Sequence, residues 1–137
     1  FKKKSLFFND LGKKITKNGI ELLNLSKQDV GFFYPFDDEG IDTKTYHIIK
    51  DGIFVSPIHT LESSTALNSN PTGNGFRAGY KNLPNSFGIN IILKAPKTVE
   101  TNNLYSFFHK AILVREGIGM HTINPISGDF SFGINGI

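Results

Sequence analysis

The sequence contains no cysteine and no tryptophan, and it has a single methionine. Without cysteine, these residues cannot form a disulfide framework, a thiolate zinc site or a cysteine nucleophile. The chain also lacks the run of ~20 apolar residues that a membrane-spanning helix requires, and no signal peptide is visible. We therefore expect a protein of a reducing compartment, the cytoplasm, that does not associate with a membrane.

The composition is typical of a globular protein. Of the 137 residues, 39% are hydrophobic and 20% are charged, and thirteen Phe and four Tyr can fill a core. We predict one domain over residues 1–137. The chain begins with Phe1 rather than Met, which suggests that this domain belongs to a longer protein.

The net charge of +3 comes largely from lysine clusters near the start of the chain. A solvated surface explains these clusters better than a nucleic-acid patch, because aromatic residues are not interleaved with the basic ones along a strand. Nucleic-acid binding would fall steeply with added salt. The lysines are Lys2, Lys3, Lys4, Lys13, Lys14 and Lys17.

Short β-prone segments predict a mainly β fold. The clearest signal is a hairpin, in which residues 43–49 and 53–58 are joined by Lys50-Asp51-Gly52. Residues 87–93 are almost continuously apolar, which predicts a strand buried on both faces. Three further segments fit short strands: residues 5–16 as a strand, turn and strand, residues 20–25 as a strand or one helical turn, and residues 117–137 as strands punctuated by glycine.

One amphipathic helix is predicted over residues 101–114. Thr101 or Asn102 fits its N-cap. Apolar side chains recur there at spacings of three and four residues, which places them on one face. They are Leu104, Phe107, Phe108, Ala111 and Ile112.

Between these elements, residues 59–80 read HTLESSTALNSNPTGNGFRAGY. Such a density of small polar residues indicates a long surface connection or a functional loop. Residues 73–78 match the pattern G-x-G-x-x-G/A. A dinucleotide site requires a helix directly after that pattern, and residues 79–84 are poor helix formers, so we reject it.

The residue pattern by itself predicts no catalytic residue and no metal site. Asp37, Asp38 and Glu39 precede Gly40 and fit a turn, since they lack the alternate spacing of a calcium loop. No H-E-x-x-H or G-x-S-x-G motif occurs. The histidines are scattered and fit structural roles: His47, His59, His109 and His121.

Four motifs in order resemble the C-terminal domain of the TldD/PmbA family, also called the modulator-of-DNA-gyrase family. They are FDDEGIDT (36–43), HIIKDGIFVSPI (47–58), STALNSNPTGNGFR (64–77) and ISGDFSFGINGI (126–137), and residues 5–15 resemble the segment that precedes them. The resemblance implies a curved antiparallel sheet or barrel-like shell with one covering helix, an α+β arrangement that is mainly β. It covers nearly the whole chain.

The family resemblance also implies a two-component cytoplasmic protease that processes peptides or unfolded protein. One subunit carries zinc, bound by an H-E-x-x-x-H helix and a cysteine, and the other subunit lacks the metal ligands. The Gly-Asp-Phe-Ser ending and the absence of cysteine resemble the PmbA, or TldE-like, branch. We therefore expect no cofactor in this chain, with zinc only in a TldD-like partner subunit.

On this basis four residues are hypotheses for substrate binding. Asn74 and Arg77 could contact a peptide backbone or carboxylate, while Asp129 and Ser131 could organise a loop. The alternative is that Asn74 and Asp129 satisfy the backbone of turns and that Arg77 pairs with the acidic trio. A groove could hold extended peptide by strand addition at a sheet edge.

Two other functions remain open from the sequence. The chain could be a structural interaction domain that supports a catalytic partner and touches no substrate. It could also be a nucleic-acid-binding or gyrase-associated module, which is supported least because aromatic residues are not interleaved with the basic ones.

Overall fold

The computed structural model describes residues 7–26, 31–100, 106, 110, 112–119, 124 and 127–136. Contacts divide the chain into two compact units. The first, here called the sheet unit, is Asp10–Pro96, and the second, the hairpin unit, contains Lys97–Ile137 and the residues just before Asp10. One domain over residues 1–137 stays a prediction, because two contact-defined units can belong to one domain.

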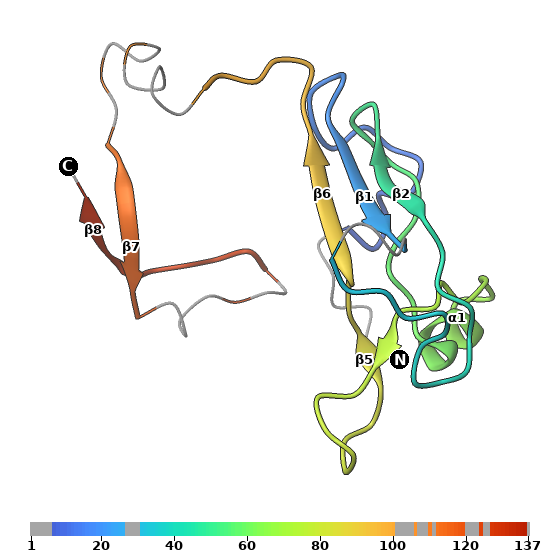
Figure 1. Ribbon diagram of the computed structural model, residues 1–137. Helices are drawn as coiled ribbons and strands as arrows, with labels where there is room; N and C mark the ends of the chain where they lie inside the picture. The colour runs from blue at the N-terminus through green and yellow to red at the C-terminus, as the bar shows by residue number, and fades with distance from the viewer. Residues whose placement is uncertain are drawn as a thin grey trace. The chain divides into compact units, whose positions relative to one another are not determined.

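The sheet unit is built on four antiparallel strands in the order β3-β2-β1-β6 (Figure 1). Their bounds are β1 Glu21–Leu25, β2 Tyr46–Lys50, β3 Ile53–Phe54 and β6 Asn90–Lys94. This arrangement confirms the predicted antiparallel, mainly β fold, and it shows residues 21–25 to be a strand. The described strands do not close into a barrel.

The predicted β2–β3 hairpin is confirmed, and its turn explains why it forms. Asp51 and Gly52 both have positive φ, 49° and 81°, as a two-residue type I′ turn requires. Gly52 N–H donates to the Ile20 carbonyl, and the Gly52 carbonyl accepts from the N–H of Ile15. The turn is therefore also hydrogen-bonded to the segment that precedes β1.

The prediction that residues 87–93 are buried on both faces is wrong. The strand is β6, and it lies at an edge of the described sheet, where Ile91 and Leu93 are exposed. A continuous apolar run does not distinguish a central strand from an edge strand. The buried apolar core of the described residues consists of Leu23 on β1 and Ile48 on β2.

The stretch 59–80 contains a short helix that was not predicted, α1, Leu61–Ala66. The Thr60 side chain accepts from Ser63 N–H, and the Ser63 hydroxyl accepts from Thr60 N–H, which forms a capping box. A six-residue helix with few apolar positions gives no helical period in the sequence. Its start was encoded instead by the Thr-x-x-Ser spacing.

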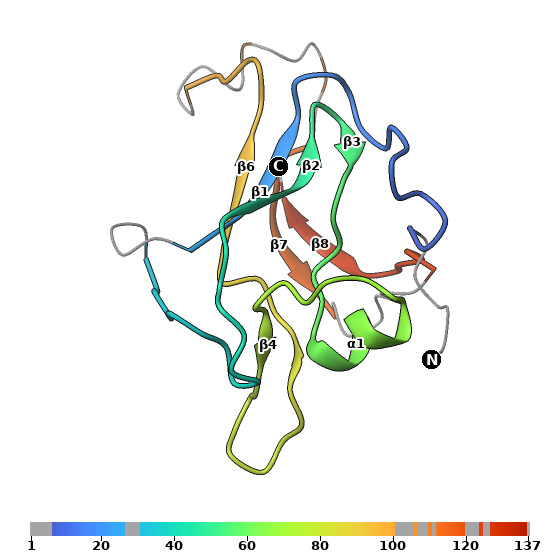
Figure 2. The same ribbon diagram turned by 90° about the vertical axis from the view of Figure 1, so that its right-hand side faces the viewer.

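After α1 the chain forms a second, two-stranded sheet. It pairs β4, Gly75–Phe76, with β5, Asn85–Ser86. Both α1 and this pair lie beyond the end of the large sheet at which β6 begins (Figures 1 and 2). The small polar residues of the sequence thus build a substructure at one end of the sheet.

The hairpin unit contains β7, Val114–Ile118, paired with β8, Gly133–Gly136. These strands confirm the short glycine-containing strands expected near the end of the chain. Most of the predicted helix 101–114 lies outside the described residues, and its last residue, Val114, instead begins β7. No helix among the described residues is long and apolar enough to cross a membrane.

Residues 5–16 were expected to form a strand, a turn and a strand. Residues 7–16, the part that the structure describes, form no β-strand. Their one β-type pairing is an isolated bridge between Lys14 and Ile53. Gly12 adopts a φ of 80°, which breaks the extended conformation in the middle of this segment.

His59 is buried beside the start of α1. The backbone N–H of His59 donates to the Thr72 hydroxyl, and its ring Nδ1 lies 3.0 Å from the Ser63 hydroxyl. Burial lowers the pKa of His59, because the charged imidazolium loses its hydration. The folded state is therefore more stable when the His59 imidazole is neutral than when it is charged.

We predict that the protein loses stability as the pH falls below about 6.5, the pKa of an unfolded histidine. Since the folded pKa of His59 is lowered, its contribution is fully present above that pH and is lost as the pH falls towards the folded pKa. Thermal unfolding midpoints between about pH 7.5 and 5 should fall in wild type and fall less in His59→Gln. His47→Gln is the matched control and should retain the His59 slope. Equal slopes in wild type and His59→Gln would contradict the prediction.

Candidate functional site

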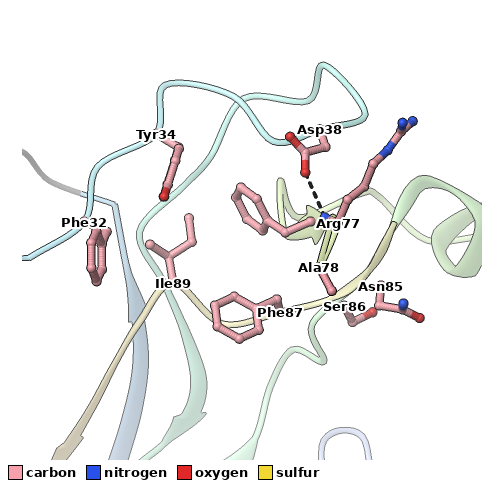
Figure 3. Close-up of a pocket in the computed structure, with 10 residues that line it drawn as sticks. Phe32, Tyr34, Asp38, Arg77, Ala78, Asn85, Ser86, Phe87 and Ile89 are labelled. Atoms are coloured by element: carbon pink, nitrogen blue, oxygen red, sulfur yellow. Dashed lines mark hydrogen bonds between the residues drawn. The ribbon is translucent and has the colours of Figure 1, made fainter. Parts of the chain in front are cut away.

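A pocket of about 660 Å³ lies within the sheet unit (Figure 3). Its size falls in the range of ligand-binding pockets, and most of its wall is apolar with a few polar groups. Three segments build it: the loop before β2, the start of the β4–β5 hairpin, and the end of that hairpin with the approach to β6. The lining residues are Phe32, Tyr34, Asp38, Phe76, Arg77, Ala78, Asn85, Ser86, Phe87 and Ile89.

Aromatic rings form one continuous wall of this pocket. The Phe76 ring centroid lies 5.4 Å from that of Tyr34 and 6.4 Å from that of Phe87, with tilted and edge-to-face geometry. Such pairs favour defined ring positions beyond simple area burial. Tyr34 and Phe87, with Phe32, are nevertheless exposed, so the wall presents apolar surface to a ligand.

The acidic trio fixes the segments around this pocket, as the carboxylate of Asp37 shows. One oxygen of Asp37 accepts from the N–H groups of Glu39 and Ile41, at 3.0 and 2.9 Å. The other oxygen accepts from Gly75 N–H at 2.8 Å. The predicted turn is thus confirmed, and its carboxylate also holds β4 in place.

The other two carboxylates of the trio bind backbone N–H groups in the same way. Asp38 accepts from Arg77 N–H at 2.8 Å, while its own N–H donates to the Gly75 carbonyl. Glu39 accepts from Leu61 N–H at the first turn of α1, at 2.7 Å. We call these contacts of Asp37, Asp38 and Glu39 the acidic clamp. It joins the loop before β2 to both β4 and α1.

Arg77 does not form the side-chain ion pair that the alternative hypothesis required. Within the described residues, its guanidinium has no carboxylate partner, and only its backbone N–H binds Asp38. The side chain is exposed and extends away from the aromatic rings (Figure 3). A free guanidinium thus lies at the rim of the pocket.

Asn74 lies behind the pocket and is fully buried. Its amide donates to the Asn24 side chain at 3.2 Å and to the Phe87 carbonyl at 2.9 Å, and its side-chain oxygen accepts from the Tyr46 hydroxyl at 2.9 Å. Burial raises the pKa of Tyr46, so this hydroxyl remains a donor above neutral pH as well. Asn74 therefore positions Phe87, and its direct contact with substrate stays a prediction.

Asp129 and Ser131 belong to the hairpin unit. The Asp129 carboxylate lies 2.6 Å from the Ser127 hydroxyl, and its carbonyl accepts from Asn124 N–H. Asp129 thus stabilises a local turn through its side chain as well as through its backbone.

The four residues predicted to bind substrate lie in two units. Asn74 and Arg77 lie together in the sheet unit, and Asp129 and Ser131 lie together in the hairpin unit. The roles of all four in substrate binding stay predictions.

The aromatic residues of the pocket were not predicted from the sequence. The available signal was the run Phe32-Phe33-Tyr34-Pro35-Phe36, since aromatic residues beside proline with no strand alternation fit neither a core strand nor a helix. Phe76 and Phe87 carried no such signal, because they join this run only through the tertiary fold.

The described residues do not fit a zinc site. Among them, no group of three or more His, Asp or Glu side chains could hold a metal ion. His47 Nε2 lies 3.6 Å from a carboxylate oxygen of Glu21, which brings together two such groups and not three. A protein zinc site requires three or four ligands, so we assign no zinc-dependent step to these residues.

The sequence is similar to proteins from archaea and bacteria. It is 27% identical over 129 residues to an uncharacterised protein of Methanocaldococcus jannaschii, covering 93% of this chain and 30% of that protein. It is 41% identical over 51 residues to a metalloprotease of Synechocystis, covering 37% of this chain and 11% of that protein. The chain therefore spans less than a third of the length of these relatives.

Two solved structures share the fold. A protein named as a candidate modulator of a DNA gyrase, from Thermotoga maritima, superimposes with a TM-score of 0.78 and 28% identity, covering 97% of this chain and 30% of that one. TldE from Thermococcus kodakarensis superimposes with a TM-score of 0.69 and 19% identity, covering 82% and 25%, which supports the fold alone.

The match to a family model covers the chain from end to end. The model is described as the PmbA/TldA metallopeptidase C-terminal domain, and it matches residues 1–137. This match confirms the family that the four sequence motifs resemble. The chain belongs to the PmbA/TldA metallopeptidase C-terminal domain family.

Proposed function

We propose that this chain is part of a companion subunit in a peptide-processing metallopeptidase complex of the TldD/PmbA type. In this proposal a TldD-like partner subunit carries the zinc, and this chain contributes part of the peptide-binding groove in the cytoplasm. The family membership and the metalloprotease name of one relative support the reaction class. The absence of cysteine and the Gly128-Asp129-Phe130-Ser131 ending support the TldE-like branch.

The pocket beside the acidic clamp is the observation that carries this proposal. An apolar peptide side chain would bury its surface against the rings of Tyr34, Phe76 and Phe87, at about 25 cal/mol per Å² removed from water. The clamp holds the pocket segments in place before a ligand arrives, which reduces the entropy lost on binding. The pocket is thus suited to one large side chain of a bound peptide.

The polar groups of the pocket suit the peptide main chain. Asn85 and Ser86 of β5 line the pocket, and within the described residues β5 pairs only with β4. An extended peptide could therefore add alongside β5 as a further strand. Arg77 would pair with a peptide carboxylate at the rim, Asn74 would hold the wall through Phe87, and Asp129 and Ser131 would order a loop of the hairpin unit.

A structural interaction domain is the second candidate. Many large apolar side chains are exposed among the described residues, and a bound partner could cover some of them. This function would require partner binding without any effect of the pocket residues on peptide turnover. The experiments below separate the two functions.

The first prediction concerns zinc in the full-length protein. We expect no stoichiometric zinc in the protein purified alone, and one zinc for each complex with its metal-bearing partner, accompanied by peptide cleavage. Elemental analysis of both preparations and a fluorogenic peptide assay test this. Stoichiometric zinc in the protein alone would overturn the companion assignment and make this protein a metallopeptidase subunit in its own right.

The second prediction concerns the centre of the aromatic wall. Phe76→Ala should lower the kcat/KM of the complex for peptides with a large apolar residue by roughly 10- to 100-fold, since burial of such a side chain contributes about 1.5–3 kcal/mol. Phe36→Ala is the control, because Phe36 is an exposed phenylalanine outside the pocket lining. Unchanged turnover in Phe76→Ala, with the partner still bound, would favour the structural interaction domain.

The third prediction concerns the charge at the rim. Arg77→Ala should reduce the processing of peptides that carry a carboxylate near the bound residue by about 2- to 5-fold, the scale of an exposed ion pair. Arg77→Lys should restore part of the loss because it retains the charge. Partner affinity, measured by titration calorimetry, should stay the same. Equal loss for peptides without a carboxylate would contradict a role in charge recognition.

A further inference from the structure

The connection between β4 and β5, residues 77–84, extends away from the other strands of the sheet unit (Figures 1 and 2). Its tip carries Tyr80 and Leu83, which are 85% and 82% exposed. These are the two most exposed large hydrophobic side chains among the described residues. Placing them in water gives the sheet unit no packing energy, so their position points to a contact outside that unit.

The tip is held in a defined shape by local interactions. Asn82 N–H donates to the Gly79 carbonyl at 2.9 Å, and the Lys81 ammonium lies 5.3 Å from the centre of the Tyr80 ring. The base of the connection is fixed by β4–β5 pairing and by the bond from Arg77 N–H to Asp38. An ordered loop loses less conformational entropy when it docks than a free one does.

The charge of this connection indicates the kind of surface it would meet. Lys81 is the charged residue of positions 78–84, and it is cationic. A complementary surface would offer an apolar pocket for the two anchor side chains, with carboxylates at its edge. Tyrosine is enriched among the residues that dominate binding energy in protein interfaces.

We propose that residues 78–84 are an anchoring loop that binds the metal-bearing partner subunit, with Tyr80 and Leu83 inserted into an apolar pocket edged by carboxylates. This inference rests on the proposed function for the identity of the partner. The loop belongs to the same hairpin as Asn85 and Ser86, which line the pocket. Docking at the tip would therefore bring the partner next to the peptide-binding pocket.

The test measures binding of the full-length protein to the full-length metal-bearing subunit by titration calorimetry or biolayer interferometry. Tyr80→Ala/Leu83→Ala should raise the Kd by about 100-fold, the scale of interface hot spots. Lys81→Glu reverses an exposed charge and removes the contact of the ammonium with the Tyr80 ring, and it should raise the Kd by about 3- to 10-fold while weakening the salt dependence. Leu11→Ala, an exposed leucine in the turn region before β1, is the control and should bind as wild type does.

Three results would overturn the anchoring loop. Wild-type affinity in Tyr80→Ala/Leu83→Ala would show that the tip is outside the interface, and the companion-subunit proposal would stand without it. A lower thermal unfolding midpoint of that variant in the absence of partner would show that the tip packs within its own protein. No binding by wild type would overturn both the loop and the proposed complex, so the two failures are distinguishable.

Discussion

The carboxylate of Asp37 is the interaction on which the candidate site depends. It is buried and accepts three backbone N–H groups, two from its own turn and one from Gly75, 38 residues further along the chain. A single side chain thereby sets the turn and attaches it to β4. Leaving a buried N–H unsatisfied costs about 1–3 kcal/mol, so loss of this carboxylate would affect several segments together.

The same dependence on polar contacts extends through the sheet unit. Its described apolar core is small, while Asn24, Asn74 and Ser64 are fully buried. Each buried side-chain polar atom among the described residues has a hydrogen-bond partner, as a low-dielectric interior requires. Asn24 and Asn74 connect β1 to the segment between β5 and β6 that carries Phe87. Because such networks demand specific geometry, they hold the pocket wall in one arrangement.

The β4–β5 hairpin links the two proposed surfaces. Its base supplies the pocket with Phe76 and Ser86, and its tip presents Tyr80 and Leu83. The acidic clamp fixes the base from one side through Gly75 and Arg77. Peptide binding at the base and partner binding at the tip would thus rest on one short hairpin whose position is set by Asp37 and Asp38.

The sequence by itself determined the local features. Lys50-Asp51-Gly52 between β-prone runs determined the β2–β3 hairpin, because a type I′ turn needs residues that tolerate positive φ. The order of the motifs determined the family, and the acidic trio before Gly40 determined a turn. Each turn signal lies within a few residues, and the motifs follow one another along the chain, so both can be recognised without the fold.

Only the tertiary structure decided where distant residues meet. Asn74 was a candidate for substrate contact in the sequence, and the fold buries it against Asn24, 50 residues away. The aromatic wall joins Tyr34, Phe76 and Phe87 from three segments, and the apolar run before Lys94 became an edge strand. Burial and strand order depend on which segments pack together, and packing is set by long-range contacts that no local pattern contains.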